Sequence, residues 1–220
     1  MWIARLRRQP IVVQAIWAGL AIAFVAALVE ARWSLAFVSV ATFALSLVPV
    51  LAQRRLGIRL PARFFGWIVV FVFATIFLGE AFDFYGRFWW WDVVLHGGSA
   101  LAFGLIGFLF VFMLFEGDRY AAPAGAMAFM SFCFALTIGA LWEIFEFAMD
   151  QIFGLNMQKT GLIDTMWDLI VDTVGAAVGA TAGYLFLQGR HLGGLTLALK
   201  EFIAANRWLY RRRRFFRKRR

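Results

Sequence analysis

Long apolar stretches separated by short polar connections make up most of this chain. A helix that crosses the hydrocarbon core of a membrane needs about 20 predominantly apolar residues. Six segments meet that requirement: residues 11–29, 33–52, 64–82, 92–115, 122–149 and 165–187. We therefore predict an all-α fold, a polytopic membrane bundle of six transmembrane helices in which residues 1–189 form one domain. A cleaved signal peptide is the alternative for the first segment, but its apolar run is longer than that of a typical signal.

The pattern changes after residue 189. Residues 195–210 place apolar side chains on one side of a helical wheel and Lys200, Glu201 and Arg207 elsewhere, which predicts a C-terminal amphipathic helix. An Arg-rich tail follows, and residues 190–220 are predicted to be cytoplasmic. Basic residues next to a membrane attract anionic lipid at about 1 kcal/mol each. The residues expected to bind anionic lipid are Arg211, Arg212, Arg213, Arg214, Arg217 and Lys218. Nucleic acid is a less favoured partner, because the spans already hold the tail at the bilayer.

The composition supports a membrane protein. Hydrophobic residues make up 63% of the chain and charged residues 16%, whereas soluble domains average about 45–50% and about 25%. Cys133 is the only cysteine, which excludes an intrachain disulfide and a Cys-rich metal site. Glycines at positions 175, 179 and 183 of the last span predict a close approach by a neighbouring helix.

The distribution of charge predicts the orientation. If both termini are cytoplasmic, 19 of the 22 Lys and Arg residues lie inside, and Arg32, Arg87 and Lys159 lie outside. This arrangement agrees with the positive-inside rule. It predicts a multi-pass membrane protein with both termini in the cytoplasm.

Acidic residues are concentrated in the outer halves of the spans in this orientation. Ionisable groups within spans are costly and usually face a protein interior or a pathway. Glu143, Glu146 and Asp150 are spaced i, i+3, i+7, and Asp164, Asp168 and Asp172 are spaced i, i+4, i+8, so each set lies on one face of a helix. We expect a buried acidic and histidine pocket near the periplasmic face. Its further members are expected to be Glu80, Asp83, Asp92, His96, Asn156 and Lys159.

Two interpretations apply to the central residues. Asp92 and His96 form an i, i+4 pair that either pins the start of a helix or supplies a metal ligand or proton shuttle. Glu143 and Glu146 resemble the paired carboxylates of metal-binding bundles, or else one is a protonated structural group. If the site is catalytic, we expect His96, Glu143 and Glu146 to take part.

The carboxylates outnumber the nearby cations, so either some are protonated or a cation is bound. Oxygen ligands with one imidazole suit a divalent cation such as Mg, Mn, Ca, Fe or Zn. The candidate metal ligands are Asp92, His96, Glu143, Glu146, Asp168 and Asp172. Asp164 is expected to cap the last span, and Asp83 and Asp150 to lie near helix ends. Lys159 is expected either to neutralise a carboxylate, to bind an anionic head group, or to belong to a polar turn between Gly154 and Gly161.

Several short motifs resemble a known family. Residues 91–96 (WDVVLH), 142–146 (WEIFE), 153–158 (FGLNMQ) and 164–168 (DTMWD) resemble the YjdF-like group of bacterial inner-membrane proteins. A looser similarity is to VanZ-like proteins, which also place an Asp and a His at a helix start. The resemblance covers residues 80–183 and implies a polytopic helical bundle in the cytoplasmic membrane, without a reaction.

Three functions remain open. A metal site could support hydrolysis or transfer on a lipid-linked substrate. The same carboxylates could relay protons or cations in a transporter, although the sequence shows no inverted repeat and no clearly broken pair of helices. The third is a structural or assembly role. The absence of an HExxH motif and of a second histidine within the spans weakens the case for an enzyme.

Overall fold

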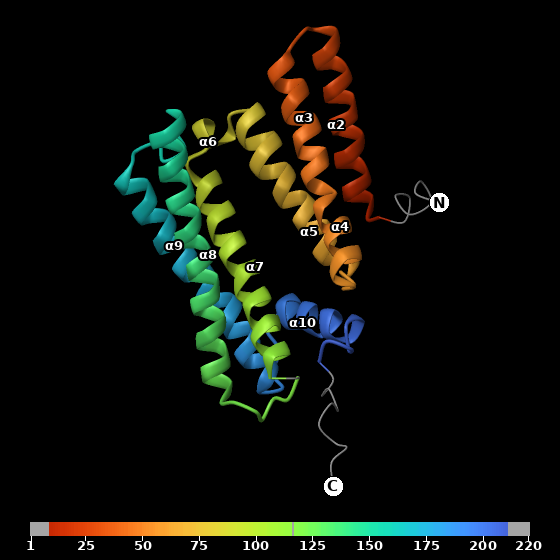
Figure 1. Cartoon of the computed structure of the whole chain (residues 1–220), viewed down its shortest axis with the longest axis vertical. Coiled ribbons are helices and arrows are strands. Elements are labelled where there is room, and N and C mark those ends of the chain that lie inside the picture. Colours follow the sequence, from red (N-terminus) through yellow and green to blue (C-terminus); the bar gives the residue numbers. More distant parts are fainter. Residues whose placement is uncertain (1–8, 116, 211–220) are drawn as a thin grey trace. The chain divides into compact units, whose positions relative to one another are not determined.

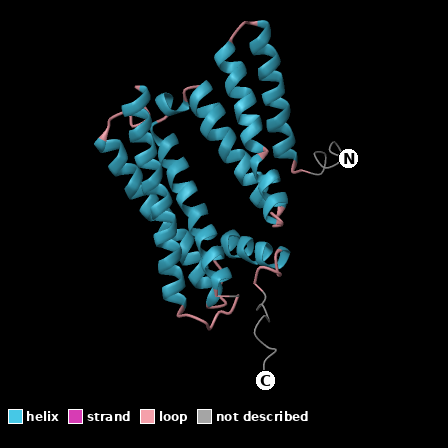
Figure 2. Cartoon of the chain, in the orientation of Figure 1, coloured by secondary structure: helices cyan, strands magenta, loops and turns pink. Residues whose placement is uncertain are grey.

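The computed structural model describes residues 9–115 and 117–210. Within these ranges every regular element is a helix (Figure 2). Six helical segments are long and apolar enough to cross a membrane. The predicted all-α, six-span architecture is therefore confirmed. The predicted lipid-binding residues Arg211 to Lys218 lie outside the described residues.

The chain forms two compact units that meet in sequence between Trp91 and Asp92. The first unit contains α2 (Ile11–Val29), α3 (Trp33–Ser46), α4 (Val48–Leu56), α5 (Ala62–Val72), the π-helix η1 (Phe73–Ala81) and α6 (Phe84–Arg87). The second contains α7 (Trp89–Leu114) from Asp92 onward, α8 (Ala124–Phe153), α9 (Leu162–Leu187) and α10 (Gly193–Ala205) (Figure 1). The single domain over residues 1–189 stays a prediction.

Two spans of the first unit differ from the continuous helices that we expected. The second span is interrupted at Leu47, and α4 begins with Pro49 in its first turn. Proline has no N–H to donate and its ring clashes with the preceding turn, so it starts a new helix. The third span changes from α-helix to π-helix at Phe73. The expected connection over residues 84–92 is also partly helical, because α6 and the start of α7 occupy it.

Buried polar side chains join α2 to α3. The indole Nε1 of Trp17 donates a 2.8 Å hydrogen bond to the Ser46 hydroxyl. Ser39, Thr42 and Ser46 are at most 2% exposed, and each donates its hydroxyl to a carbonyl of the preceding turn of α3. Small hydroxyl residues of this kind allow two helices to pack closely in lipid.

Glycines set the distance between α7 and α9. A Cβ added to Gly104 would lie 2.9 Å from the Cα of Gly179 and 3.0 Å from the carbonyl oxygen of Ala176. A Cβ on Gly175 would overlap the carbonyl oxygen of Gly97. The two backbones are therefore in direct contact, which confirms the close approach predicted from the glycine repeat.

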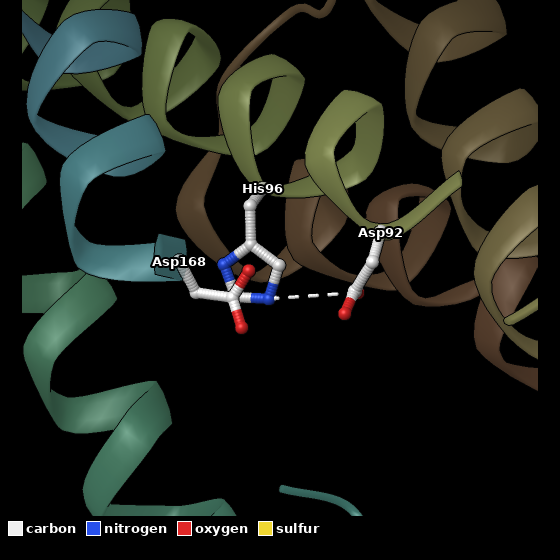
Figure 3. Close-up of side chains that lie close together, drawn as sticks. All are labelled: Asp92, His96 and Asp168. Carbon is white, nitrogen blue, oxygen red and sulfur yellow. Dashed lines mark ion pairs between the residues drawn. The ribbon is translucent and has the colours of Figure 1, made fainter. Parts of the chain in front are cut away.

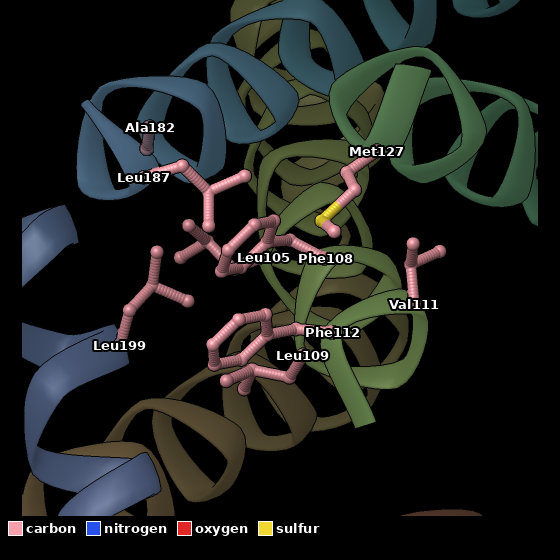
Figure 4. Packing of buried hydrophobic residues seen from close by; sticks show 9 residues of the cluster. All are labelled: Leu105, Phe108, Leu109, Val111, Phe112, Met127, Ala182, Leu187 and Leu199. Atoms are coloured by element: carbon pink, nitrogen blue, oxygen red, sulfur yellow. The ribbon is translucent and has the colours of Figure 1, made fainter. Parts of the chain in front are cut away.

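The amphipathic helix predicted over residues 195–210 corresponds to α10, which packs on the apolar core of the second unit. Leu199 is fully buried against a cluster that includes Phe112, Met127 and Leu187 (Figure 4). Tyr210 follows the helix and its hydroxyl lies 3.4 Å from the carbonyl oxygen of Leu109. Both contacts attach the C-terminal segment to α7 and α9.

We predict different effects from adding one methyl group to two glycines of α7. Gly104→Ala should lower the free energy of unfolding by about 1–3 kcal/mol, because the new Cβ meets backbone atoms of α9 that have no room to move. Gly98→Ala meets nothing within 4 Å and should be neutral or slightly stabilising. Chemical unfolding of each variant in detergent micelles measures the difference. Equal effects would contradict the close packing of α7 on α9.

Candidate functional site

Three helices of the second unit bury charged side chains together. The exposed fraction of each is small: His96 9%, Glu143 4%, Glu146 9%, Asp168 4% and Asp172 1%. His96 comes from α7, the two glutamates from α8 and the two aspartates from α9. Their helical spacing predicted that they would face the interior, and their burial confirms this.

The imidazole of His96 lies between two carboxylates. Its Nε2 lies 3.8 Å from Asp92 Oδ1, one turn earlier on α7. Its Nδ1 lies 3.4 Å from Asp172 Oδ1 on α9. Each ring nitrogen therefore faces its own carboxylate, and this arrangement fixes the orientation of the ring.

Three residues bring possible metal ligands together. One ligand atom from each of Asp92, His96 and Asp168 lies within 4.8 Å of the others. Figure 3 shows Asp168 extending toward the His96 ring, with Asp92 on the other side of the group. One imidazole and two carboxylates form a donor set that suits Mg, Mn, Fe or Zn. These residues fit a divalent cation, and the assignment of Glu143, Glu146 and Asp172 as ligands stays a prediction.

Glu143 is the least satisfied group of the cluster. Both of its carboxylate oxygens are buried without a hydrogen-bond partner among the described residues. Glu146 differs, because its Oε1 accepts a 2.9 Å hydrogen bond from the indole Nε1 of Trp142. A buried polar group without a partner is costly, and a buried charge is more costly still. Glu143 therefore requires a proton or a nearby cation.

A glycine makes room for Asp172. A Cβ on Gly139 of α8 would overlap Asp172 Oδ2 and would lie 3.0 Å from its Cγ. The carboxylate thus packs directly on the backbone of α8. The sequence motifs did not indicate Gly139, since only the contact between α8 and α9 shows that a side chain cannot be accommodated there.

The α8–α9 connection carries a lysine to the site. Asp150 accepts hydrogen bonds from the backbone N–H groups of Met157 (2.7 Å) and Gln158 (2.9 Å), so it shapes this loop. Lys159, with a positive φ of 34°, places its Nζ 3.7 Å from Asp92 Oδ2. This contact agrees with the alternative in which Lys159 neutralises a carboxylate, and the residue also lies in a turn between Gly154 and Gly161, as the polar-turn alternative has it. Asn156 is exposed in the same loop.

The expected cap of the last span is wrong. α9 begins at Leu162, and its N-cap is Gly161 with φ 69° and ψ −130°. Only glycine adopts that conformation readily, so the helix starts before Asp164. Asp164 instead lies in the first turn, where a negative charge still favours the positive end of the helix.

Glu80 and Asp83 belong to the first unit. Glu80 is exposed near the end of η1. Asp83 precedes α6 with φ 56°, in the left-handed region that Asp tolerates better than most residues. Their membership of the acidic pocket stays a prediction.

The six apolar spans define an integral membrane protein of the polytopic helical class, with a buried Asp/His cluster. The family model described as "Predicted membrane protein (DUF2238)" matches residues 12–189, and the chain belongs to this family.

The chain is also similar to a Thermotoga maritima protein described as "Uncharacterized protein". The two are 34% identical over 120 residues, which cover 54% of this chain and 60% of the relative. The chain thus matches less than two thirds of that protein's length. No solved structure matches the chain.

We predict that Asp150 stabilises the loop that holds Lys159. Asp150→Ala removes the acceptor for two backbone N–H groups and should cost about 1–3 kcal/mol of local stability. Hydrogen–deuterium exchange should then accelerate across residues 154–161. Gln151→Ala, at the exposed neighbouring position, is the matched control and should leave exchange unchanged. Unaltered exchange in Asp150→Ala would show that the loop does not depend on this carboxylate.

We predict that Gly139 and Asp172 are energetically coupled. Gly139→Ala should destabilise the protein by about 1–3 kcal/mol, because the added methyl group overlaps the Asp172 carboxylate. In an Asp172→Ala background the overlap is removed, so the same change should cost less. A double-mutant cycle of unfolding free energies measures this coupling. Additive effects would mean that a methyl group at position 139 has no steric contact with Asp172.

Proposed function

We propose that the protein holds a divalent cation at Asp92, His96 and Asp168 and uses it for hydrolysis or transfer on a lipid-linked substrate. The observation that carries the proposal is the grouping of one imidazole and two carboxylates within 4.8 Å. Glu143 supports it, since both of its buried oxygens lack a hydrogen-bond partner among the described residues and a nearby cation is one of the two ways to compensate their burial. The site lies on membrane-spanning helices, where an unneutralised group of carboxylates would be costly.

Each residue has a distinct role in this proposal. Asp92, His96 and Asp168 would hold the ion through one imidazole and two carboxylates. Asp172 Oδ1 lies 3.4 Å from Nδ1 of His96 and would orient the ring by this ion pair. In its ionised form Glu143 would act as the general base, because both of its buried oxygens lack a hydrogen-bond partner among the described residues. The Trp142 indole holds Glu146, one turn further along α8, through a 2.9 Å hydrogen bond. A bound divalent ion would supply Lewis acidity at a carbonyl or phosphoryl oxygen.

An apolar groove on α9 supports a lipid-linked substrate. It has a volume of about 250 Å³ and is lined by Leu162, Ile163, Met166, Trp167 and Ile170. These residues share the first turns of α9 with Asp168 but are exposed, whereas Asp168 is buried. An acyl chain lying in this groove would place its polar end close to the start of α9 and the site.

The distribution of charge supports a location in the cytoplasmic membrane. With both termini inside, the basic loop that contains Arg54, Arg55 and Arg59 is cytoplasmic, and the site faces the periplasm. Anionic lipid at the C-terminal tail belongs to the same proposal. The likeness to YjdF-like and VanZ-like proteins fits this arrangement and adds no reaction.

A proton- or cation-coupled transporter is the second candidate. Asp164, Asp168 and Asp172 follow one face of α9 from its first turn into the bundle. Acidic residues in such a series relay protons or cations in pumps. The sequence shows no clearly broken pair of helices, which speaks against a transporter. In the structure the second span is interrupted at Leu47 and the third continues as the π-helix η1, so that objection is weaker. A structural or assembly role is the third candidate.

We predict about one divalent ion per chain in the purified protein. His96→Ala and Asp168→Asn should lose the ion, because each removes a ligand. Asp172→Asn should weaken ion binding by about 10- to 100-fold, because it alters only the orientation of His96. Elemental analysis and metal titration measure these effects. Asp118→Asn, which changes an exposed acid of the same unit, should bind the ion normally.

The same variants separate the three functions. Loss of the ion in His96→Ala and Asp168→Asn, with the fold intact, supports the metal site. A wild-type protein that binds no divalent ion contradicts it. In that case, cation or proton flux in proteoliposomes that disappears in Asp168→Asn and Asp172→Asn identifies a transporter. Lower stability without an ion or flux phenotype leaves the structural role.

A further inference from the structure

A polar cavity lies in the first unit. It has a volume of about 520 Å³ and is formed by the α2–α3 connection, the first turn of α3 and the end of η1. Arg32 and Glu80 give it opposite charges, and Ser34 adds a hydroxyl. Leu35 and Val38 contribute an apolar wall.

The position of the cavity indicates which ligands reach it. α2 ends at Val29, α3 begins at Trp33 and η1 ends at Ala81, so the cavity lies where three membrane spans end. Span ends lie at the boundary between hydrocarbon and head groups. Trp33 is 70% exposed beside the cavity, and tryptophan is enriched at this depth.

The backbone beside Arg32 is tightly constrained. Ala31 has φ 54°, a left-handed conformation that is uncommon for any residue except glycine. The N–H of Ala31 bonds to Leu28 and that of Arg32 bonds to Ala27, which closes α2 with the usual glycine replaced by alanine. The last two residues of the π-helix η1 also line the cavity, and π-helical segments often occur at functional sites. The strained backbone conformation of Ala31 points to a function for the α2–α3 connection.

The two charges of the cavity do not neutralise each other. Arg32 Nη1 lies 3.5 Å from Glu30 Oε2, outside the cavity lining. No ion pair joins Arg32 to Glu80 within the described part of the chain. A guanidinium has five N–H donors, so the pair with Glu30 leaves donors for a ligand. The cavity therefore presents a cation and an anion to one occupant.

We infer that this cavity binds an aminoethyl phosphate group. The phosphate would pair with Arg32, whose planar donors suit phosphate oxygens. The primary ammonium would donate hydrogen bonds to Glu80. In a phosphatidylethanolamine molecule, Leu35 and Val38 would contact the apolar part next to the head group. This site is independent of the function proposed above.

The chemistry predicts a selectivity among lipids. Phosphatidylglycerol carries the phosphate but no ammonium, so the charge of Glu80 would stay unpaired. Phosphatidylcholine carries a quaternary ammonium that has no N–H to donate. Phosphatidylethanolamine satisfies both residues and should be preferred over both.

Native mass spectrometry of the full chain with the three lipids, matched in acyl chains, tests the inference. The wild type should prefer phosphatidylethanolamine to phosphatidylglycerol by roughly three- to tenfold. Glu80→Gln should abolish this preference, and Arg32→Gln should weaken the binding of both lipids by a similar factor. Asp83→Asn removes a nearby negative charge outside the cavity and tolerates the same backbone conformation, so it should behave as the wild type.

Two further measurements complete the test. Ser34→Trp fills the cavity while both charges remain, and it should reduce the binding of phosphatidylethanolamine. Soluble aminoethyl phosphate that competes with the lipid at millimolar concentration would identify a free zwitterion as a second source of the same chemistry, whereas no competition assigns the membrane lipid. Wild-type selectivity in Glu80→Gln, or its equal loss in Asp83→Asn, would overturn the inference.

Discussion

The cost of placing carboxylates within membrane-spanning helices is the constraint on which the second unit depends. Water is not available in hydrocarbon to solvate a charge, so each acidic side chain needs a partner supplied by the protein or by a bound ion. Asp92 has Lys159 and His96, and Asp172 has the other nitrogen of His96. Glu146 has the Trp142 indole. Glu143 has no hydrogen-bond partner among the described residues, so it needs either a proton or a nearby cation.

Residues without side chains make the cluster possible. Gly104 and Gly179 let α7 approach α9 closely, and Gly139 lets the Asp172 carboxylate lie on the backbone of α8. The distance between Asp172 and His96 depends on both approaches. Because lipid does not drive helices together as water does, close packing of this kind supplies much of their association. The packing that stabilises the unit is thus also the packing that assembles its site.

Much of this arrangement followed from the sequence, because it depends on local periodicity. The apolar runs predicted the spans, and the spacing of Glu143 with Glu146 and of Asp168 with Asp172 predicted which side chains face inward. Other features depend on contacts between distant segments. The role of Asp150 requires the path of the loop after α8, and the position of Asp172 at Nδ1 of His96 requires the depth of α9 against α7. The start of α9 was predicted wrongly. The helix is capped by Gly161, in a backbone conformation that glycine adopts readily, and Asp164 therefore lies in the first turn instead of at the cap.

The surroundings of the His96 ring bear on the ion proposed for the site, because both ring nitrogens face carboxylate oxygens. A histidine that only links two helices needs one good partner, whereas here one ring nitrogen faces Asp172 at 1% exposure and the other faces the group formed with Asp92 and Asp168. The first carboxylate fixes the ring, which leaves the second nitrogen available as a ligand. Lys159 reaches Asp92 from the loop at 3.7 Å, so a lysine cation and a bound ion would share one carboxylate. Binding of an ion at the proposed site would therefore be linked to the position of the α8–α9 loop, which Asp150 holds in place.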